Sequence, residues 1–277
     1  MDEKLLSKYE ELKEYIASLE SVAVAFSSGA DSTFLLYAAK EALGDKIIAV
    51  TASASFFPKR EFDEADAYCK DLGISQFIVN TSEMEIEGFT SNPKNRCYLC
   101  KKEIFKKIKM IADEQNIAEV IEGSNLDDNG DYRPGHIAIK ELDIKSPLRH
   151  VGLTKQEIRD LSKYLNIPTW SKPSFACLAS RFPYGEEISK EKLEMVEKSE
   201  QLLLDMGFTQ LRVRIHGDVA RIELPTDDFA RFMDEKVRTV VYKKLVEFGF
   251  NYVSLDIVGF RSGSMNEAIG EKKKINI

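Results

Sequence analysis

Short apolar runs alternate with amphipathic stretches over the N-terminal part of the chain. Four of these runs are continuous, as in strands buried on both faces of a sheet; they cover 21–26, 46–52, 76–80 and 118–122. Helical spacing of apolar residues predicts helices over 33–43, 58–73 and 98–116, and an N-terminal helix carrying Leu5, Tyr9, Leu12, Ile16 and Leu19 on one face. Thr154 and Glu157 form a capping box for a further helix. This alternation predicts an α/β fold: a doubly wound, mostly parallel sheet with helices on both faces.

The pattern changes after about residue 187. A helix is expected over 189–206, followed by two short strands, 211–216 and 220–224, joined by a tight turn at His216-Gly217-Asp218. A long helix and a last strand, 252–258, complete a smaller α+β arrangement. We therefore expect two domains, a nucleotide-binding domain over 1–187 and a substrate or oligomerisation domain over 188–277.

The most informative motif follows the first predicted strand. It reads Phe26-Ser27-Ser28-Gly29-Ala30-Asp31-Ser32-Thr33. A loop between a buried strand and a helix N-terminus is a natural anion site, because backbone N–H groups and the helix dipole point at the ligand. Ser27, Ser28, Gly29, Ser32 and Thr33 are candidate phosphate ligands. Asp31 cannot bind phosphate directly but can hold a Mg²⁺ ion that does.

This loop resembles the SGGxDS pyrophosphate loop of the N-type ATP pyrophosphatases. The resemblance implies cleavage of ATP between the α and β phosphates, adenylation of a substrate and release of pyrophosphate. Ser28 stands where those enzymes have the first glycine, so its side chain would come close to the pyrophosphate. The alternative interpretation of the loop is a simple helix N-cap with small neighbours.

Composition narrows the class of partner. Lys+Arg 39 against Asp+Glu 46 gives a net charge of −7. A net acidic chain argues against a dedicated nucleic-acid or anionic-membrane binder. No apolar run approaches membrane-spanning length, and the charged first residues are unlike a signal peptide, so we expect a cytoplasmic protein. Its four cysteines are then thiols, metal ligands or reactive groups rather than structural disulfides.

One cysteine lies in a loop punctuated by proline and glycine near the expected domain junction. This loop runs from Lys172 to Tyr184-Gly185 and contains Cys177-Leu178-Ala179-Ser180-Arg181. Arg181 follows Cys177 by four residues and could lower the thiol pKa or bind an anion. A packed loop cysteine is the plainer alternative.

Three segments together resemble the LarE family: the loop SSGADST, the segment Glu122-Gly123-Ser124-Asn125-Leu126-Asp127-Asp128 with Asp131-Tyr132-Arg133-Pro134-Gly135, and the loop CLASRFPYG. The resemblance places Gly123 in the nucleotide site. It implies adenylation of a carboxylate of pyridinium-3,5-biscarboxylic acid mononucleotide and its conversion to a thiocarboxylate, in the biosynthesis of the nickel-pincer nucleotide cofactor. It also implies a homo-oligomer. In the sacrificial version of this chemistry, the cysteine at position 177 displaces AMP and ends as dehydroalanine.

A second cysteine motif opens another possibility. Cys97 and Cys100 form a CxxC at the start of a predicted helix, which suits a metal or a redox pair. Two thiolates are incomplete for an iron–sulfur cluster, but Cys177 would be a third. As in some relatives, three cysteines would hold a [4Fe–4S] cluster whose open iron carries sulfide. Packed thiols remain the alternative for Cys97 and Cys100, and we interpret Cys69 as a core residue.

An anionic substrate requires cations. Arg212 and Arg214 alternate along one strand and therefore face the same side. With Arg181 and Arg261 they could clamp a phosphate or carboxylate, although ion pairs with Glu223 are an alternative for any one of them. Asp127, Asp128 and Asp131 form an acidic run, in which Asp128 joins Asp31 as a candidate Mg²⁺ ligand. The three histidines are isolated in sequence and receive no role.

The favoured function is therefore ATP-dependent sulfur insertion, which uses ATP and Mg²⁺. The sulfur is delivered either by a [4Fe–4S] cluster or by a sacrificial Cys177. Sulfide or another sulfur donor is the expected partner. A tRNA thiolation enzyme would call for a basic surface, which the acidic composition does not favour. An ammonia-dependent ligase would not need Cys177. A non-enzymatic nucleotide sensor would release no pyrophosphate.

Overall fold

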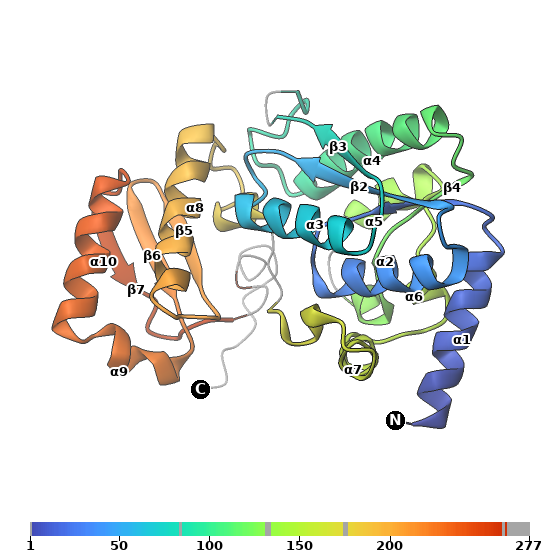
Figure 1. The fold of residues 1–277 in the computed structure, drawn as a ribbon. Helices are drawn as coiled ribbons and strands as arrows, with labels where there is room; N and C mark the ends of the chain where they lie inside the picture. Colours follow the sequence, from blue (N-terminus) through green and yellow to red (C-terminus); the bar gives the residue numbers. More distant parts are fainter. Residues whose placement is uncertain (1, 83–84, 131–133, 174–176, 262–263, 265–277) are drawn as a thin grey trace. The chain divides into compact units, whose positions relative to one another are not determined.

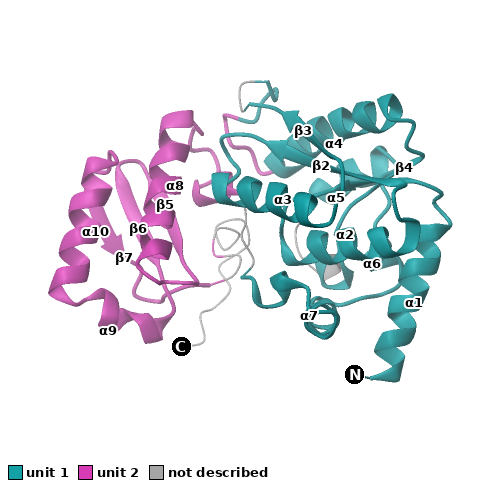
Figure 2. Cartoon of the chain, in the orientation of Figure 1, with its two compact units in different colours: residues 1–89, 95–175 teal, residues 90–94, 176–277 magenta. Residues whose placement is uncertain are grey.

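The computed structural model describes residues 2–82, 85–130, 134–173, 177–261 and 264 (Figure 1). The chain divides into two compact units (Figure 2): unit 1 comprises 1–89 and 95–175, and unit 2 comprises 90–94 and 176–277. The loop around Cys177 thus belongs to unit 2, ahead of the division at 187 expected from the sequence. An ion pair explains why this loop belongs to unit 2, because Arg181 of the loop is paired with a glutamate on a helix of that unit.

A four-stranded parallel sheet forms the centre of unit 1. Its strands are β1 (Val22–Ala25), β2 (Ile47–Ser53), β3 (Gln76–Asn80) and β4 (Glu119–Ile121), in the order β3-β2-β1-β4. Val22 of β1 is in register with Ile47 of β2 and with Glu119 of β4. The strand order reverses between β1 and β4, which is where doubly wound sheets bind ligands at the carboxyl ends of their strands.

Helices cover this sheet on both faces, as Figure 1 shows. The connections β1–β2 and β2–β3 run through α2 (Ala30–Leu43) and α3 (Lys59–Asp71), which lie on one face. The return from β3 to β4 runs through α4 (Arg96–Glu114) on the other face. The doubly wound α/β prediction is confirmed.

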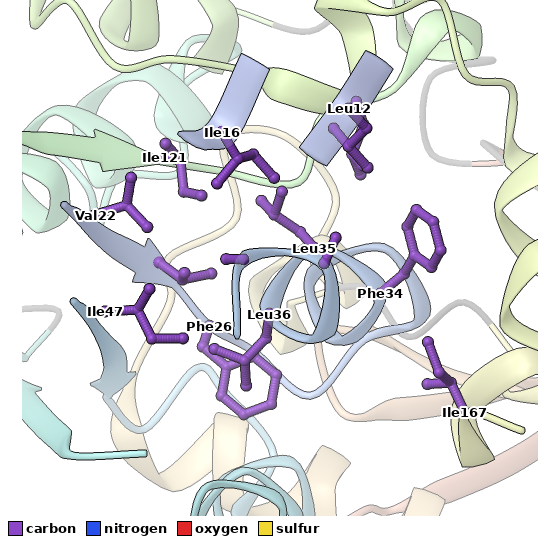
Figure 3. Close-up of a cluster of buried hydrophobic side chains, with 14 of the residues drawn as sticks. Leu12, Ile16, Val22, Phe26, Phe34, Leu35, Leu36, Ile47, Ile121 and Ile167 are labelled. Carbon is purple, nitrogen blue, oxygen red and sulfur yellow. The ribbon is translucent and has the colours of Figure 1, made fainter. Parts of the chain in front are cut away.

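The core of unit 1 lies between the sheet and its first helices (Figure 3). Helix α1 (Glu3–Ala17) packs on α2, and its Leu12 and Ile16 are fully buried beside Phe34 and Leu35. Strand β1 is almost completely buried, which is why its sequence is continuously apolar. Cys69 is part of this core, as expected, and burial raises the pKa of its thiol to about 12.

Short helices follow β4, and the sequence pattern did not predict all of them. They are the 3₁₀ helix η1 (Leu126–Gly130), α5 (Gly135–Glu141), α6 (Pro147–His150), α7 (Lys155–Tyr164) and the 3₁₀ helix η2 (Pro168–Ser171). The predicted capping box is present at α7: the Thr154 side chain accepts from the Glu157 backbone, and the Glu157 carboxylate accepts from the Thr154 backbone. Helices α5 and α6 are too short to show a helical period.

Unit 2 is an α+β arrangement around a three-stranded sheet. Strands β5 (Arg212–His216) and β6 (Val219–Glu223) form an antiparallel hairpin, and β7 (Tyr252–Leu255) adds to β6 in parallel. The helical segments are η3 (Leu178–Arg181), α8 (Lys190–Asp205), η4 (Thr226–Asp228), α9 (Phe229–Phe232) and α10 (Glu235–Glu247). Within the described part of the chain, no helix is long and apolar enough to cross a membrane.

Candidate functional site

The predicted phosphate loop lies at the carboxyl end of β1 and leads directly into α2. Gly29 is the N-cap residue, and no side chain caps the helix there. The Ser32 hydroxyl folds back onto the loop, 3.2 Å from both the Ser27 Oγ and the Gly29 carbonyl. The Thr33 hydroxyl is buried and has no hydrogen-bond partner in the part of the chain that the structure describes. The first turn of a fourteen-residue helix is therefore available to an anion.

Ser28 differs from the expectation that its side chain would approach the pyrophosphate. Its backbone has a positive φ of 52°, which turns the side chain into the protein. The Ser28 hydroxyl donates to the Glu61 carbonyl at 2.9 Å and lies 3.1 Å from the Glu61 carboxylate on α3. Lys172 ties the two together, because its Nζ donates to the Ser28 carbonyl at 3.0 Å and to Glu61 at 2.8 Å. Ser28 thus connects the phosphate loop to Glu61 on α3.

Asp31 on the first turn of α2 carries one free carboxylate oxygen. Its Oδ2 accepts from Lys155 Nζ at 2.6 Å, whereas its Oδ1 is buried and has no hydrogen-bond partner among the described residues. Burial raises the pKa of Asp31; the charge of Lys155 opposes this and the charge of Asp128 adds to it. A buried carboxylate oxygen without a donor is suited to a cation ligand.

The end of β4 packs closely against the phosphate loop. A Cβ on Gly123 would lie 3.1 Å from the Ser32 backbone nitrogen, so a larger residue would push on the start of α2. Two aspartates in the loop that follows make hydrogen bonds to backbone N–H groups. Asp128 accepts from the Asn125 backbone at 3.0 Å, and Asp127 accepts from the Lys155 backbone at 2.8 Å. Asp131, also expected in this acidic run, lies outside the described residues.

The CxxC motif occupies the first turn of α4 in unit 1. Cys97 is exposed and Cys100 is buried. Their spacing of three places both on the same side of the helix, close to its N-terminus, where a negatively charged group is favoured. Among the residues that the structure describes, no group of three or more His, Cys, Asp or Glu side chains is placed to hold a metal ion.

Cys177 precedes the 3₁₀ helix η3 in unit 2 and is partly exposed. Arg181, at the end of that helix, is fully buried. Its guanidinium makes two bonds to Glu200 of α8, at 2.7 and 2.8 Å, and Nη1 donates to the Cys177 carbonyl at 3.3 Å. Burial works to raise the pKa of Glu200, but Arg181, Arg212 and the Val213 backbone together outweigh it, so the pKa lies below its ordinary value. Arg181 thereby fixes the backbone of the cysteine loop.

Arg212 and Arg214 lie buried on the same face of β5, as predicted. Arg214 pairs with Glu223 in a two-point contact of 3.1 and 3.0 Å and also donates to the Ser180 carbonyl. Arg212 stacks over Phe260, and burial followed by the charge of Arg181 lowers its pKa to about 10. Arg261 lies 3.5 Å from Asp256, which also accepts from Arg221.

Arginines and carboxylates alternate in this cluster. Among the described residues it contains the guanidiniums of Arg181, Arg212, Arg214, Arg221 and Arg261 and the carboxylates of Glu200, Glu223 and Asp256. Arg181, Arg212 and Arg214 are buried, as are the three carboxylates, whereas Arg221 and Arg261 are partly exposed. Guanidinium groups are suited to binding an anionic ligand.

Sequence reasoning missed the charged partners of the loop. Lys155 and Lys172 both reach the phosphate loop from positions far along the chain. The only available signal was the helix start at Thr154, which places Lys155 at a helix N-terminus but says nothing of its partner. The sequence also gave no sign that Glu61 contacts the phosphate loop, because a glutamate in the first turn of a helix is common.

Fold and site together define a nucleotide-binding α/β protein with a pyrophosphate loop at the switch point of its sheet. No family model matches the chain. An uncharacterized protein of Synechocystis sp. is 39% identical over 265 residues, which are 96% of this chain and 99% of the relative. The pyridinium-3,5-bisthiocarboxylic acid mononucleotide synthase of Lactiplantibacillus plantarum is 35% identical over 269 residues, 96% of each chain. A glutamine-hydrolyzing GMP synthase of Chlamydia caviae is 25% identical over 220 residues, 70% of this chain and 41% of the relative.

The near-complete coverage at 35% identity decides the family. The chain belongs to the LarE family of the pyrophosphate-loop superfamily.

Proposed function

We propose that this protein is an ATP-dependent sulfurtransferase that converts pyridinium-3,5-biscarboxylic acid mononucleotide to its thiocarboxylate. The observation that carries the proposal is the relationship to the Lactiplantibacillus plantarum synthase over 96% of both chains, together with the phosphate loop at the carboxyl end of β1. A carboxylate is a poor electrophile, and adenylation converts it to a mixed anhydride with a good leaving group. A thiolate or sulfide then displaces AMP.

In this proposal unit 1 carries out the first step, the adenylation of the substrate. The loop Ser27–Thr33, with Gly123 packed against it, receives the phosphates of ATP at the N-terminus of α2. The unpartnered Asp31 Oδ1 fits a Mg²⁺ ligand, and Asp128 is close enough for its charge to act on Asp31. Bound Mg²⁺ would neutralise phosphate charge as pyrophosphate leaves. Lys155 holds Asp31 in place and brings a second positive charge to the same position.

The second step requires sulfur, and the proposal has two forms. In one, Cys97, Cys100 and Cys177 ligate a [4Fe–4S] cluster that delivers sulfide. In the other, Cys177 attacks the adenylate and gives up its own sulfur. The CxxC on the first turn of α4 supports the first form, because sacrifice needs only Cys177. The partial exposure of Cys177 is consistent with either.

The substrate is an anion, and the arginine cluster of unit 2 supports its binding there. Arg212, Arg214 and Arg261 are proposed to contact it. Arg181 takes part indirectly, since its two-point pairing with Glu200 holds the loop of Cys177. A cytoplasmic homo-oligomer remains part of the proposal, as implied by the family.

A pyrophosphate-release assay tests the function directly. Purified protein with ATP and Mg²⁺ is expected to release pyrophosphate only when the dicarboxylate mononucleotide is added, and mass spectrometry should detect a thiocarboxylate product. Nicotinamide mononucleotide, which lacks free carboxylates on its ring, is the control substrate. Amide rather than thiocarboxylate formation when ammonia is supplied would instead make the protein an ammonia-dependent ligase.

A further inference from the structure

Three basic side chains lie near one another in unit 1 at a place that the sequence did not indicate. They are Lys101 of α4, His136 of α5 and Arg149 of α6. His136 Nε2 lies 3.2 Å from Arg149 Nη2. The aliphatic part of Lys101 covers Gly135, where an added Cβ would come within 2.7 Å of Lys101 Cδ. Helices α4 and α5 are packed neighbours, which is why residues distant in sequence converge here.

Carboxylates lie near this cluster, but among the described residues none is ion-paired with its lysine or its arginine. Arg149 Nε is buried and has no hydrogen-bond partner among these residues. Glu122 lies close enough for its charge to act on His136, and its two oxygens accept from the hydroxyls of Ser124, at 2.7 Å, and Ser146, at 2.5 Å. By contrast Lys155, Lys172, Arg181 and Arg214 are all ion-paired. A buried guanidinium donor without an acceptor is costly, so the site favours an anion.

The cluster also lies on the edge of the sheet that carries the phosphate loop. Glu122 directly follows β4, which pairs with β1. Asp31 and His136 both lie within range of the charge of Asp128. An anion held here would therefore lie at the same side of the sheet as the phosphate loop.

We infer that Lys101, His136 and Arg149 form an oxyanion-binding site that holds a carboxylate of the mononucleotide substrate beside the phosphate loop. The inference deepens the proposed function and rests on it for the identity of the ligand. A guanidinium binds a carboxylate through two parallel N–H groups, and the ammonium of Lys101 adds a third donor. A phosphate group of ATP is the alternative anion that these donors would bind.

Substitutions separate these two sources. Arg149→Gln and Lys101→Gln, made separately, are expected to raise KM for the dicarboxylate mononucleotide roughly tenfold or more, while KM for ATP changes less than about twofold. Arg149→Lys should recover part of the loss. Lys140→Gln is the matched control, because Lys140 is an exposed cation on α5, the helix of His136. A rise in KM for ATP alone would assign the site to ATP, and unchanged KM values would overturn it.

A second measurement does not depend on turnover. The chain has only three histidines, so each can be followed by NMR. Burial and the charges of Arg149 and Lys101 lower the pKa of His136, opposed by Glu122 and Asp128. Adding pyridine-3,5-dicarboxylate should move the His136 midpoint to higher pH and leave His150 unmoved, and Arg149→Gln should abolish the response. If the protein releases no pyrophosphate but His136 responds, the function fails and the anion site stands; no response at His136 refutes the site.

Discussion

Arg181 and Glu200 form a fully buried ion pair that joins the loop of Cys177 to helix α8. Arg181 Nε and Nη2 bond to the two oxygens of Glu200 at 2.7 and 2.8 Å, and Glu200 also accepts from the Val213 backbone on β5 at 2.9 Å. One pair therefore connects the cysteine loop, a helix and a strand. The arginine that the sequence marked as a possible anion ligand is fully buried and anchors the loop that carries the thiol.

Breaking this pair should destabilise the protein. Arg181→Met leaves the Glu200 carboxylate buried without its partner, and we expect a loss of about 3–5 kcal/mol in the free energy of unfolding. Denaturant unfolding followed by circular dichroism measures it. Lys198→Met, which removes an exposed charge from the same helix, should change stability by less than about 0.5 kcal/mol. Equal effects of the two substitutions would contradict a structural role for the pair.

The same pair predicts a pH dependence. Glu200 has a pKa below its ordinary value of 4.5 in the folded protein, so the folded state binds this proton less tightly than the unfolded chain does. The ionised carboxylate therefore contributes stability above about pH 4.5, and this contribution is lost as the pH falls through the folded pKa. Glu200→Gln removes that contribution. Its melting temperature should fall less between about pH 7 and about pH 4 than that of the unaltered protein; an identical fall would count against the assignment.

Asp31 should be essential for adenylation but not for folding. Asp31→Ala removes the unpartnered oxygen that fits a Mg²⁺ ion and leaves Lys155 without its carboxylate. We expect pyrophosphate release to fall at least about a hundredfold, while circular dichroism stays unchanged. Asp45→Ala, at an exposed position paired with Lys40, serves as the control. Normal pyrophosphate release by folded Asp31→Ala protein would remove Asp31 from the site.

The arginines of β5 should discriminate between the two ligands. Arg212→Ala and Arg214→Ala are expected to weaken mononucleotide binding more than ATP binding, by roughly 1.5–3 kcal/mol for each lost charge-assisted contact. Titration calorimetry with each ligand measures the two affinities. Arg214→Ala should also lower the melting temperature, because it leaves Glu223 buried with fewer partners. Equal losses for both ligands would move the substrate site elsewhere.

Iron content and the mass of Cys177 decide between the two sulfur routes. With a cluster, anaerobic reconstitution should give about four irons per chain, and Cys97→Ala, Cys100→Ala or Cys177→Ala should each remove most of it. Turnover with sulfide should be repeated, and Cys177 should keep its mass.

A sacrificial Cys177 predicts the reverse. Cys97→Ala and Cys100→Ala would keep their activity, turnover would stop at one sulfur per Cys177, and the intact mass would fall by about one H₂S as dehydroalanine forms. Cys69→Ala is the control for both routes, because Cys69 is buried in the core and has no expected role in the chemistry.

The sequence by itself determined the architecture of unit 1 and the position of its phosphate loop. Continuous apolar runs mark buried strands because a parallel sheet covered on both faces has no solvent side, and β3 coincides with the predicted run 76–80. The motif at Ser27–Thr33 needed only a preceding strand and a following helix to be predicted as an anion site. The capping box at Thr154 was equally local, since both of its partners lie within one turn.

Only the tertiary structure decided which charges meet. Lys155 and Asp31 are 124 positions apart, and Lys172 and Ser28 are 144 apart. Hydrophobic periodicity reports which face of an element is buried, but a long charged side chain finds its partner among loops that the sheet brings to one edge. The same reason explains why Arg181 and Arg214 turned out to be ion-paired, and why His136, isolated in sequence, lies against Arg149.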